Sequence, residues 1–162
     1  MNTIYLSLGA NIGDRAQNIA RAIEALASRG VRVTRQSSLY ETEPVEMSSA
    51  DWFLNCVVEA ETDLAPEQLI QALLEIERSL GRERGVLHGP RTIDIDILLF
   101  GSSVVRTADL EIPHPRMAGR RFVLVPFAEI APGAQHPVLK KTIAALLAET
   151  ADRSEVRPWH AA

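Results

Sequence analysis

In the first hundred residues, two helix-length segments separate stretches that resemble β-strands, and this order constrains the fold most strongly. Residues 16–27 carry apolar side chains at helical spacing and end before Gly30; residues 64–81 have Pro66 in the first turn and Gly81 at the end. Strand-like patterns occupy residues 4–8, residues 31–39, residues 52–62 and the second half of residues 89–101. The chain is therefore predicted to run β-α-β-β-α-β.

This order predicts an α+β fold of the ferredoxin-like βαββαβ type, an antiparallel sheet with helices packed on one face. A C-terminal extension follows, with a short hairpin over residues 102–112, one or two short helices over 117–131, an amphipathic helix over 140–150 and a polar tail. Residues 40–51 are predicted to form a polar loop. A chain of 162 residues suffices for one core, so we expect a single domain over residues 1–162.

Composition and charge exclude several broad classes of protein. Hydrophobic residues make up 46% and charged residues 23% of the chain, which is ordinary for a globular protein, and the net charge of −4 argues against a general nucleic-acid binder. Cys56 is the only cysteine and has apolar neighbours, so we interpret it as a core residue. The first residues turn polar by Asn11 and lack a signal peptide's basic start, and no apolar run is long enough to span a membrane. We expect a cytoplasmic protein that binds neither nucleic acid nor membrane.

Two acidic residues stand close together at the start of the strand in "GPRTIDIDILLFG". Side chains two positions apart on a strand share a face, so Asp94 and Asp96 are predicted to project together. Such carboxylates repel each other, and Mg²⁺, which prefers oxygen ligands, is their natural partner. Alternatively, both are solvated at the strand end or pair with neighbouring arginines. The apolar residues are predicted to divide between the faces, with Leu98 and Phe100 beside the acids and Ile95, Ile97 and Leu99 opposite.

Basic residues flank this acidic pair along the sequence. Metal-binding acids combined with arginines are the components of phosphoryl transfer, which depends on positioning and charge neutralisation. His114 stands between two prolines and can donate to a phosphate, or it is simply a surface residue. The arginines in question are Arg82, Arg84, Arg91, Arg120 and Arg121.

Three further positions invite a functional interpretation beside a structural one. Glu77 falls within the apolar stripe of its helix, where a charge needs a partner or a ligand, unless it caps or snorkels at the helix end. Phe53 and Asn55 share one strand face and suit a flat heterocycle, but a core phenylalanine beside a hydrogen-bonded asparagine is an equal alternative. The stripe around Glu77 comprises Ile70, Leu73, Leu74 and Leu80.

The glycine-containing turn "GANIGD" lacks the lysine and hydroxyl residue of a phosphate-binding loop. We interpret it as a strand-to-helix turn, with Asn11 or Asp14 near the helix cap.

Several of these segments occur in a recognisable order. "LSLGANIGD", "FLNCVVEAET", "LGRERG", "GPRTIDIDILLFG" and "IPHPRMAGRRFVLVPFAEIAP" together closely resemble the 6-hydroxymethyl-7,8-dihydropterin pyrophosphokinase family, over residues 3–145. The resemblance implies transfer of the terminal pyrophosphate of ATP to the hydroxymethyl group of the dihydropterin, leaving AMP, in folate biosynthesis. It also implies a ferredoxin-like fold with the site in a valley across the sheet.

The resemblance also implies roles for particular residues. Asp94 and Asp96 would bind two Mg²⁺ ions that bridge the ATP phosphates, and Arg82 and Arg91 would join them as catalytic residues. ATP contacts would come from Glu77, Arg82, Arg84, Arg91, Ile97, His114 and Arg120. Pterin contacts would come from Thr42, Pro44, Val45, Phe53, Asn55, Asp94 and Phe122, with backbone atoms contributing at residues 42–45 and an aromatic sandwich formed by Phe53 and Phe122.

Two alternatives stand beside this hypothesis. One is a ferredoxin-like RNA-binding or regulatory module, although the acidic pair would repel a phosphate backbone. The other is a relative that binds the nucleotide without turnover, because Leu87 and His88 replace the basic residue and aromatic that often precede the Gly-Pro of this family. The expected partners are the small-molecule substrates ATP and 6-hydroxymethyl-7,8-dihydropterin, and we expect a monomer.

Overall fold

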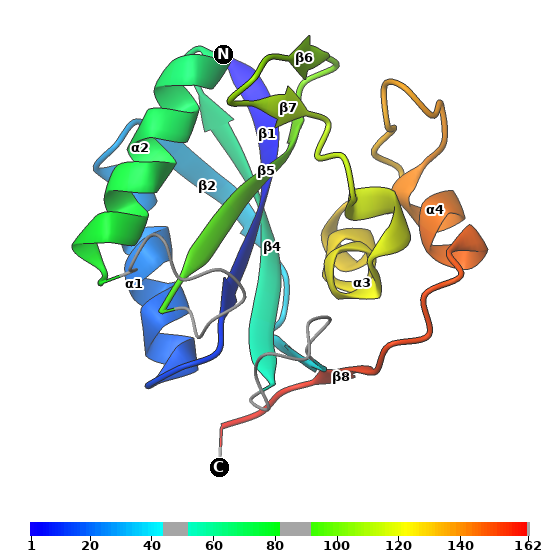
Figure 1. The fold of residues 1–162 in the computed structure, drawn as a ribbon, viewed down its shortest axis with the longest axis horizontal. Helices are drawn as coiled ribbons and strands as arrows, with labels where there is room; N and C mark the ends of the chain where they lie inside the picture. Colours follow the sequence, from blue (N-terminus) through cyan, green and yellow to red (C-terminus); the bar gives the residue numbers. More distant parts are fainter. Residues whose placement is uncertain (44–51, 82–91, 162) are drawn as a thin grey trace.

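A central antiparallel sheet lies between two layers of helices in the computed structural model (Figure 1), which describes residues 1–43, 52–81 and 92–161. The strands of the sheet are β1 (Asn2–Ala10), β2 (Val31–Gln36), β3 (Tyr40–Thr42), β4 (Phe53–Thr62), β5 (Asp94–Phe100) and β8 (Val156–Pro158). A separate hairpin joins β6 (Val105–Arg106) and β7 (Glu111–Ile112). The helices are α1 (Arg15–Ala27), α2 (Pro66–Ser79), the 3₁₀ turn η1 (Met117–Gly119), α3 (Arg121–Ile130) and α4 (Ile143–Glu149).

The strand order is β5-β1-β4-β3-β8, with β2 also paired to β4. Every pairing within this sheet is antiparallel. Helix α1 connects β1 to β2, and these two strands lie on either side of β4. Helix α2 connects β4 to β5, and these two strands lie on either side of β1. This arrangement confirms the predicted α+β class and antiparallel sheet, and is compatible with the ferredoxin-like type.

Apolar side chains form one core on each face of the sheet. One core lies between the sheet and α1 and α2, and the other, smaller core lies between the sheet and α3 and α4 (Figure 1). The predicted C-terminal extension thus supplies the second helical layer. No helix among the described residues is long and apolar enough to cross a bilayer.

Two strands form where the sequence predicted irregular chain. β3 falls within the predicted polar loop of residues 40–51, and β8 falls within the predicted polar tail. The two pair with each other, Glu41 opposite Arg157, at a separation of 116 residues. Strands of three residues are too short to show a period in the sequence. These expectations were wrong because the pairing is entirely tertiary.

The side chains of β5 do not alternate strictly between the two faces of the sheet, as the sequence had predicted they would. The register of β1 against β5 shifts between Tyr5 and Leu6, which leaves Leu98 as an extra residue. Leu98 and Leu99 therefore both join the core under α3, and Phe100 returns to the core under α1 and α2. Strict alternation predicted Leu99 on the face of Ile97 and Phe100 on the face of the acids, and each lies on the other face instead. Alternation fails here because the bulge at Leu98 interrupts it.

The turn before α1 behaves as a helix start. The side chain of Asp14 accepts a hydrogen bond from the backbone N–H of Gln17 at 3.1 Å, so Asp14 is the helix cap. The strand-to-helix turn is shorter than predicted, because Gly9 and Ala10 of "GANIGD" still belong to β1.

Candidate active site

A row of side chains crosses three adjacent strands on the sheet face that carries α3. Gly9 of β1 lies opposite Asn55 of β4 on one side and opposite Asp94 of β5 on the other. Ser7, two residues earlier in β1, lies opposite Asp96. Since Leu54 and Cys56 point into the core under α1 and α2, Asn55 points to the other face. The central strands thus bring Asn55 and Asp94 to neighbouring places around Gly9.

Gly9 allows the amide of Asn55 to lie across β1. A Cβ atom added at Gly9 would stand 2.4 Å from Oδ1 of Asn55, far inside any permitted contact. The Nδ2 group of Asn55 donates to Oγ1 of Thr42 at 2.7 Å, and the exposed fractions of Asn55 and Thr42 are only 4% and 2%. The amide is therefore held in one orientation, with Nδ2 directed toward β3 and Oδ1 directed over β1.

Phe53 shares the face of Asn55 and is half-buried, as the i, i+2 relation predicts. Thr42 contributes its side chain by fixing Asn55, whereas the resemblance implied a contribution from backbone atoms. Pro44 and Val45 lie outside the described residues.

The two acids stand at the start of β5, on the same face as the row. Asp94 is half-buried and Asp96 is exposed. No group of three or more histidine, cysteine, aspartate or glutamate side chains that could hold a metal ion occurs among the described residues. A Mg²⁺ ion held by one or two carboxylates takes its remaining oxygens from water and phosphate, so this pair has the right chemistry for such an ion.

Glu77 connects α2 to the acidic strand. Its exposed fraction is 2%, and Oε2 accepts a hydrogen bond from the backbone N–H of Ile95, between the two acids, at 2.7 Å. A buried carboxylate is costly without such a donor. The capping or snorkelling alternative for Glu77 is therefore wrong, because the side chain points into the protein and bonds to β5.

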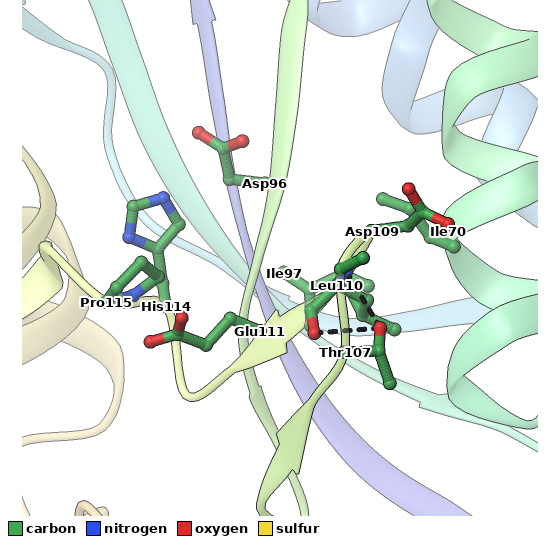
Figure 2. Close-up of a pocket in the computed structure, with 10 residues that line it drawn as sticks. Ile70, Asp96, Ile97, Thr107, Asp109, Leu110, Glu111, His114 and Pro115 are labelled. Atoms are coloured by element: carbon green, nitrogen blue, oxygen red, sulfur yellow. Dashed lines mark hydrogen bonds between the residues drawn. The ribbon is translucent and has the colours of Figure 1, made fainter.

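A pocket of about 310 Å³ opens beside β5 and the arm that carries β6 and β7. Figure 2 shows the imidazole of His114 and the carboxylate of Asp96 on one side of it, with Thr107, Asp109 and Ile70 on the other. This volume lies at the lower end of the range of small-molecule sites. The residues that line it are Ile70, Asp96, Ile97, Thr107, Ala108, Asp109, Leu110, Glu111, His114 and Pro115.

His114 presents a neutral ring to this pocket. Burial, and then the positive charges of Arg120 and Arg116, lower the pKa of His114 from 6.5 to about 4. Nδ1 accepts a hydrogen bond from the backbone N–H of Arg116 at 3.1 Å, so the proton of the neutral ring resides on Nε2. His114 is therefore an uncharged N–H donor at neutral pH.

The start of α3 carries the remaining described candidates, Arg120 and Phe122. The guanidinium carbon of Arg120 lies 5.4 Å from the centroid of the Phe122 ring, within cation–π range. Both side chains are partly exposed.

Six of the described candidates fall into two groups that meet at β5. Thr42, Asn55 and Asp94 belong to the row around Gly9, while Asp96, Ile97 and His114 line the pocket. Arg82, Arg84 and Arg91, like Leu87 and His88, lie outside the described residues.

Sequence reasoning missed Gly9, Ile70 and the arm residues 107–111. Gly9 was assigned to the turn after the first strand, but β1 continues to Ala10, and a glycine inside a strand indicates close approach of another group. Ile70 was assigned to the apolar stripe of its helix and does pack, half-buried, against the core there, but it also lines the pocket. The arm carries no motif, and only the fold brings it to the pocket. Ile97 reaches the pocket although it faces away from the acids, because β5 is an end strand of the sheet.

Comparison with known proteins finds one matching family and several similar sequences. The sequence model of the 7,8-dihydro-6-hydroxymethylpterin-pyrophosphokinase family matches residues 5–132. The 2-amino-4-hydroxy-6-hydroxymethyldihydropteridine pyrophosphokinase of Bacillus subtilis is 44% identical over 159 residues, which cover 98% of this chain and 90% of the relative. The enzyme of the same name from Methylorubrum extorquens is 47% identical over 133 residues, or 82% of this chain and 84% of the relative.

Other relatives are much longer than this chain. The folic acid synthesis protein fol1 of Pneumocystis carinii is 39% identical over 96% of this chain, which spans only 21% of that relative. Among solved structures, Plasmodium falciparum HPPK-DHPS with pteroate is similar in fold, with a TM-score of 0.74 and 18% sequence identity. The match covers 91% of this chain and 42% of that structure's chain. At this low identity the structural likeness concerns the fold alone.

Proposed function

The chain belongs to the 7,8-dihydro-6-hydroxymethylpterin-pyrophosphokinase family, and we propose that it transfers pyrophosphate from ATP to 6-hydroxymethyl-7,8-dihydropterin. It is an ATP-dependent diphosphotransferase of folate biosynthesis, and AMP is its nucleotide product. One observation carries this proposal. The polar row around Gly9 and the pocket beside β5 adjoin each other at Asp94 and Asp96. We further propose that it acts in the cytoplasm as a monomer.

We assign the dihydropterin to the row around Gly9. A pterin is a flat ring with hydrogen-bond donors and acceptors along one edge, and an amide fixed in orientation can pair with such an edge. The bond from Asn55 to Thr42 fixes that orientation, and the absence of a side chain at Gly9 leaves room for the amide. Phe53 and Phe122 supply aromatic faces for stacking from β4 and from α3.

We assign ATP to the pocket beside β5, whose apolar residues Ile70, Ile97 and Leu110 suit a base or ribose. The phosphates would extend from the pocket toward the acids. The neutral Nε2–H of His114 can donate to a phosphate oxygen, and the guanidinium of Arg120 can neutralise phosphate charge. Arg82, Arg84 and Arg91 remain proposed phosphate ligands on the strength of the family resemblance.

Asp94 and Asp96 would hold two Mg²⁺ ions between the two substrate sites. When bound, Mg²⁺ neutralises the phosphate charge and orients the phosphates. The fold contributes the common face of the two carboxylates and the Glu77 bond that fixes the backbone between them. Transfer then consists of attack by the pterin hydroxymethyl oxygen on the β-phosphorus. A new oxygen–phosphorus bond forms, and the bond from the β-phosphorus to the α–β bridging oxygen breaks, so that this oxygen leaves as part of AMP. The hydroxyl proton passes to water.

The test is product analysis after incubation with ATP, Mg²⁺ and the hydroxymethyl dihydropterin. We expect AMP and the dihydropterin pyrophosphate in equal amounts, separated by chromatography and identified by mass. Formation of ADP, or of AMP without a modified pterin, would contradict the proposal. A parallel reaction with a chelator in place of Mg²⁺ is expected to give no product.

A further inference from the structure

The chain after α4 runs to β8, which pairs with β3 at the edge of the sheet (Figure 1, red). Residues 152–157 of this segment attach to two elements that carry candidate pterin contacts. One attachment is at Asp152 and the other is at Arg157.

Asp152 caps the first turn of α3 from outside the helix. Its Oδ2 accepts the backbone N–H of Arg121 at 2.8 Å, and its Oδ1 accepts the backbone N–H and the hydroxyl of Ser154 at 2.9 and 2.6 Å. Arg121 in turn donates through Nε to the carbonyl of Ser154 at 3.1 Å. Because the residue at the cap position, Arg120, makes no side-chain capping bond, Asp152 performs this task for the turn that carries Arg120 and Phe122.

Arg157 secures the other side of the site through Glu41. Its Nη2 and Nε donate to Oε1 of Glu41 at 2.8 and 3.2 Å, and Arg15 of α1 contacts Oε2 of the same carboxylate at 2.9 Å. The guanidinium carbon of Arg157 also lies 4.4 Å from the centroid of the Trp52 ring, and Arg15 donates to the Trp52 carbonyl at 2.9 Å. Glu41 and Trp52 are therefore joined through two arginines.

The cluster of Arg15, Glu41, Trp52 and Arg157 adjoins the proposed pterin contacts along the chain. Glu41 and Thr42 are consecutive residues of β3, so their side chains project to opposite faces of the sheet. Trp52 directly precedes Phe53, the first residue of β4. A shift of the backbone at Glu41 or Trp52 therefore displaces Thr42 or Phe53. Asn55, which is bonded to Thr42, is displaced with them.

Global stability alone is a weak reason for this arrangement. The side chain of Arg157 is 54% exposed, and exposed ion pairs contribute little to the free energy of unfolding. The main cores lie elsewhere, on either side of β1, β4 and β5. The cluster instead occupies a place from which it controls the position of pterin contacts.

We propose that residues 152–157 are a positioning element for the pterin half of the site, in which Asp152 holds the start of α3 and Arg157 holds β3 and β4. This inference rests on the proposed function. Neither residue touches the substrate; each acts through the residues it holds.

The test measures KM for the dihydropterin, KM for ATP, kcat and Tm in the full chain. In Arg157→Ala and in Glu41→Gln, we expect the dihydropterin KM to rise about fivefold, with the ATP KM and kcat within about twofold of wild type. The dihydropterin Kd, measured by calorimetry without turnover, is expected to rise by the same factor. Glu41→Gln keeps the side chain's shape, so it remains informative if the alanine variant folds poorly.

A matched control is Arg32→Ala. Arg32 pairs with Glu61 across β2 and β4 at the end of β4 away from Phe53, so this variant removes a cross-strand arginine–glutamate pair remote from the site. We expect all four quantities to stay near their wild-type values.

If the wild type is active and both variants keep its dihydropterin KM and Kd, the positioning role is wrong and the proposed function still stands. An equal rise in the ATP KM would also overturn it, because a general loosening of the fold affects both substrates. A wild type that makes no AMP would overturn the proposed function, and the inference with it.

Discussion

At the residue scale, the proposed mechanism depends most on the exposed carboxylate of Asp96. Asp96→Asn keeps the size and removes the charge, so we expect the fold to survive and kcat to fall by about a thousandfold or more, as when a metal ligand is lost. The measurement is AMP formation at saturating substrates, with far-ultraviolet circular dichroism to confirm folding. Asp63→Asn, an exposed acid beyond the end of β4, is the matched control. Retained activity in Asp96→Asn would contradict the proposed metal role.

Gly9 offers a second prediction at this scale. A methyl group at Gly9 would meet Oδ1 of Asn55 at 2.4 Å, so Gly9→Ala is expected to displace the Asn55 amide and raise the dihydropterin KM about tenfold. Gly133→Ala is the control, because a Cβ there meets no atom within 4 Å. A Gly9→Ala enzyme with unchanged dihydropterin KM would show that the amide's orientation does not matter.

His114 is predicted to titrate far below the ordinary range. Because the folded pKa of about 4 lies below the ordinary 6.5, the unfolded chain binds the proton more readily. The contribution of His114 to stability is therefore complete above pH 6.5 and is lost progressively as the pH falls from 6.5 toward 4. An NMR titration of the His114 ring measures this directly, and a midpoint near 6.5 would contradict it.

Residue patterns predicted chemistry better than they predicted contacts. The relation between Asp94 and Asp96 follows from strand alternation, and so does that between Phe53 and Asn55, since each pair spans two positions within one strand. The bond of Glu77 to Ile95, and that of Asn55 to Thr42, join residues of different elements. Their partners could not be predicted, because no local pattern records which backbone or hydroxyl a buried side chain will meet.

At the element scale, α3 depends on a cap supplied from beyond α4. Asp152→Ala removes the acceptor for the Arg121 N–H, so we expect a loss of about 1 kcal/mol in the free energy of unfolding, measured by urea denaturation. A change indistinguishable from zero would contradict the capping role.

The same carboxylate gives this stability a dependence on pH. Burial raises the pKa of Asp152, but hydrogen bonds from Ser154 and from the Arg121 backbone outweigh it, and the pKa lies below the ordinary 3.8. The contribution of Asp152 is therefore complete well above pH 3.8 and is lost as the pH falls through the folded pKa. The stability difference between wild type and Asp152→Ala is expected to shrink below pH 3.8.

Element prediction succeeded for the long, periodic segments and failed for the short ones. The strands at β1 and β4 and the helices α1 and α2 are each long enough to show a period in the sequence. β3 and β8 each have three residues, and their pairing depends on Glu41 meeting Arg157 from the other end of the chain. The β5 bulge is likewise set by the pairing with β1, so alternation within β5 could not reveal it.

At the scale of the whole molecule, the sheet places the two proposed substrate sites on either side of one edge strand. Its central strands carry the row around Gly9, its β5 edge adjoins the pocket, and Asp94 and Asp96 stand where the two meet. The helices α1 and α2 pack on one face of the sheet, and α3 and α4 of the C-terminal extension pack on the other. The βαββαβ order predicted the first layer, but the second depends on how the extension folds back over the sheet.

The central claim is that this arrangement transfers two phosphoryl groups together. It is tested most directly with ATP carrying a radioactive label in the β-phosphate, in the presence of Mg²⁺ and the hydroxymethyl dihydropterin. We predict that the label leaves the nucleotide completely and appears in the pterin product, with unlabelled AMP released. Label that stays in the nucleotide while the γ-phosphate moves, or no transfer to the pterin, would contradict the account.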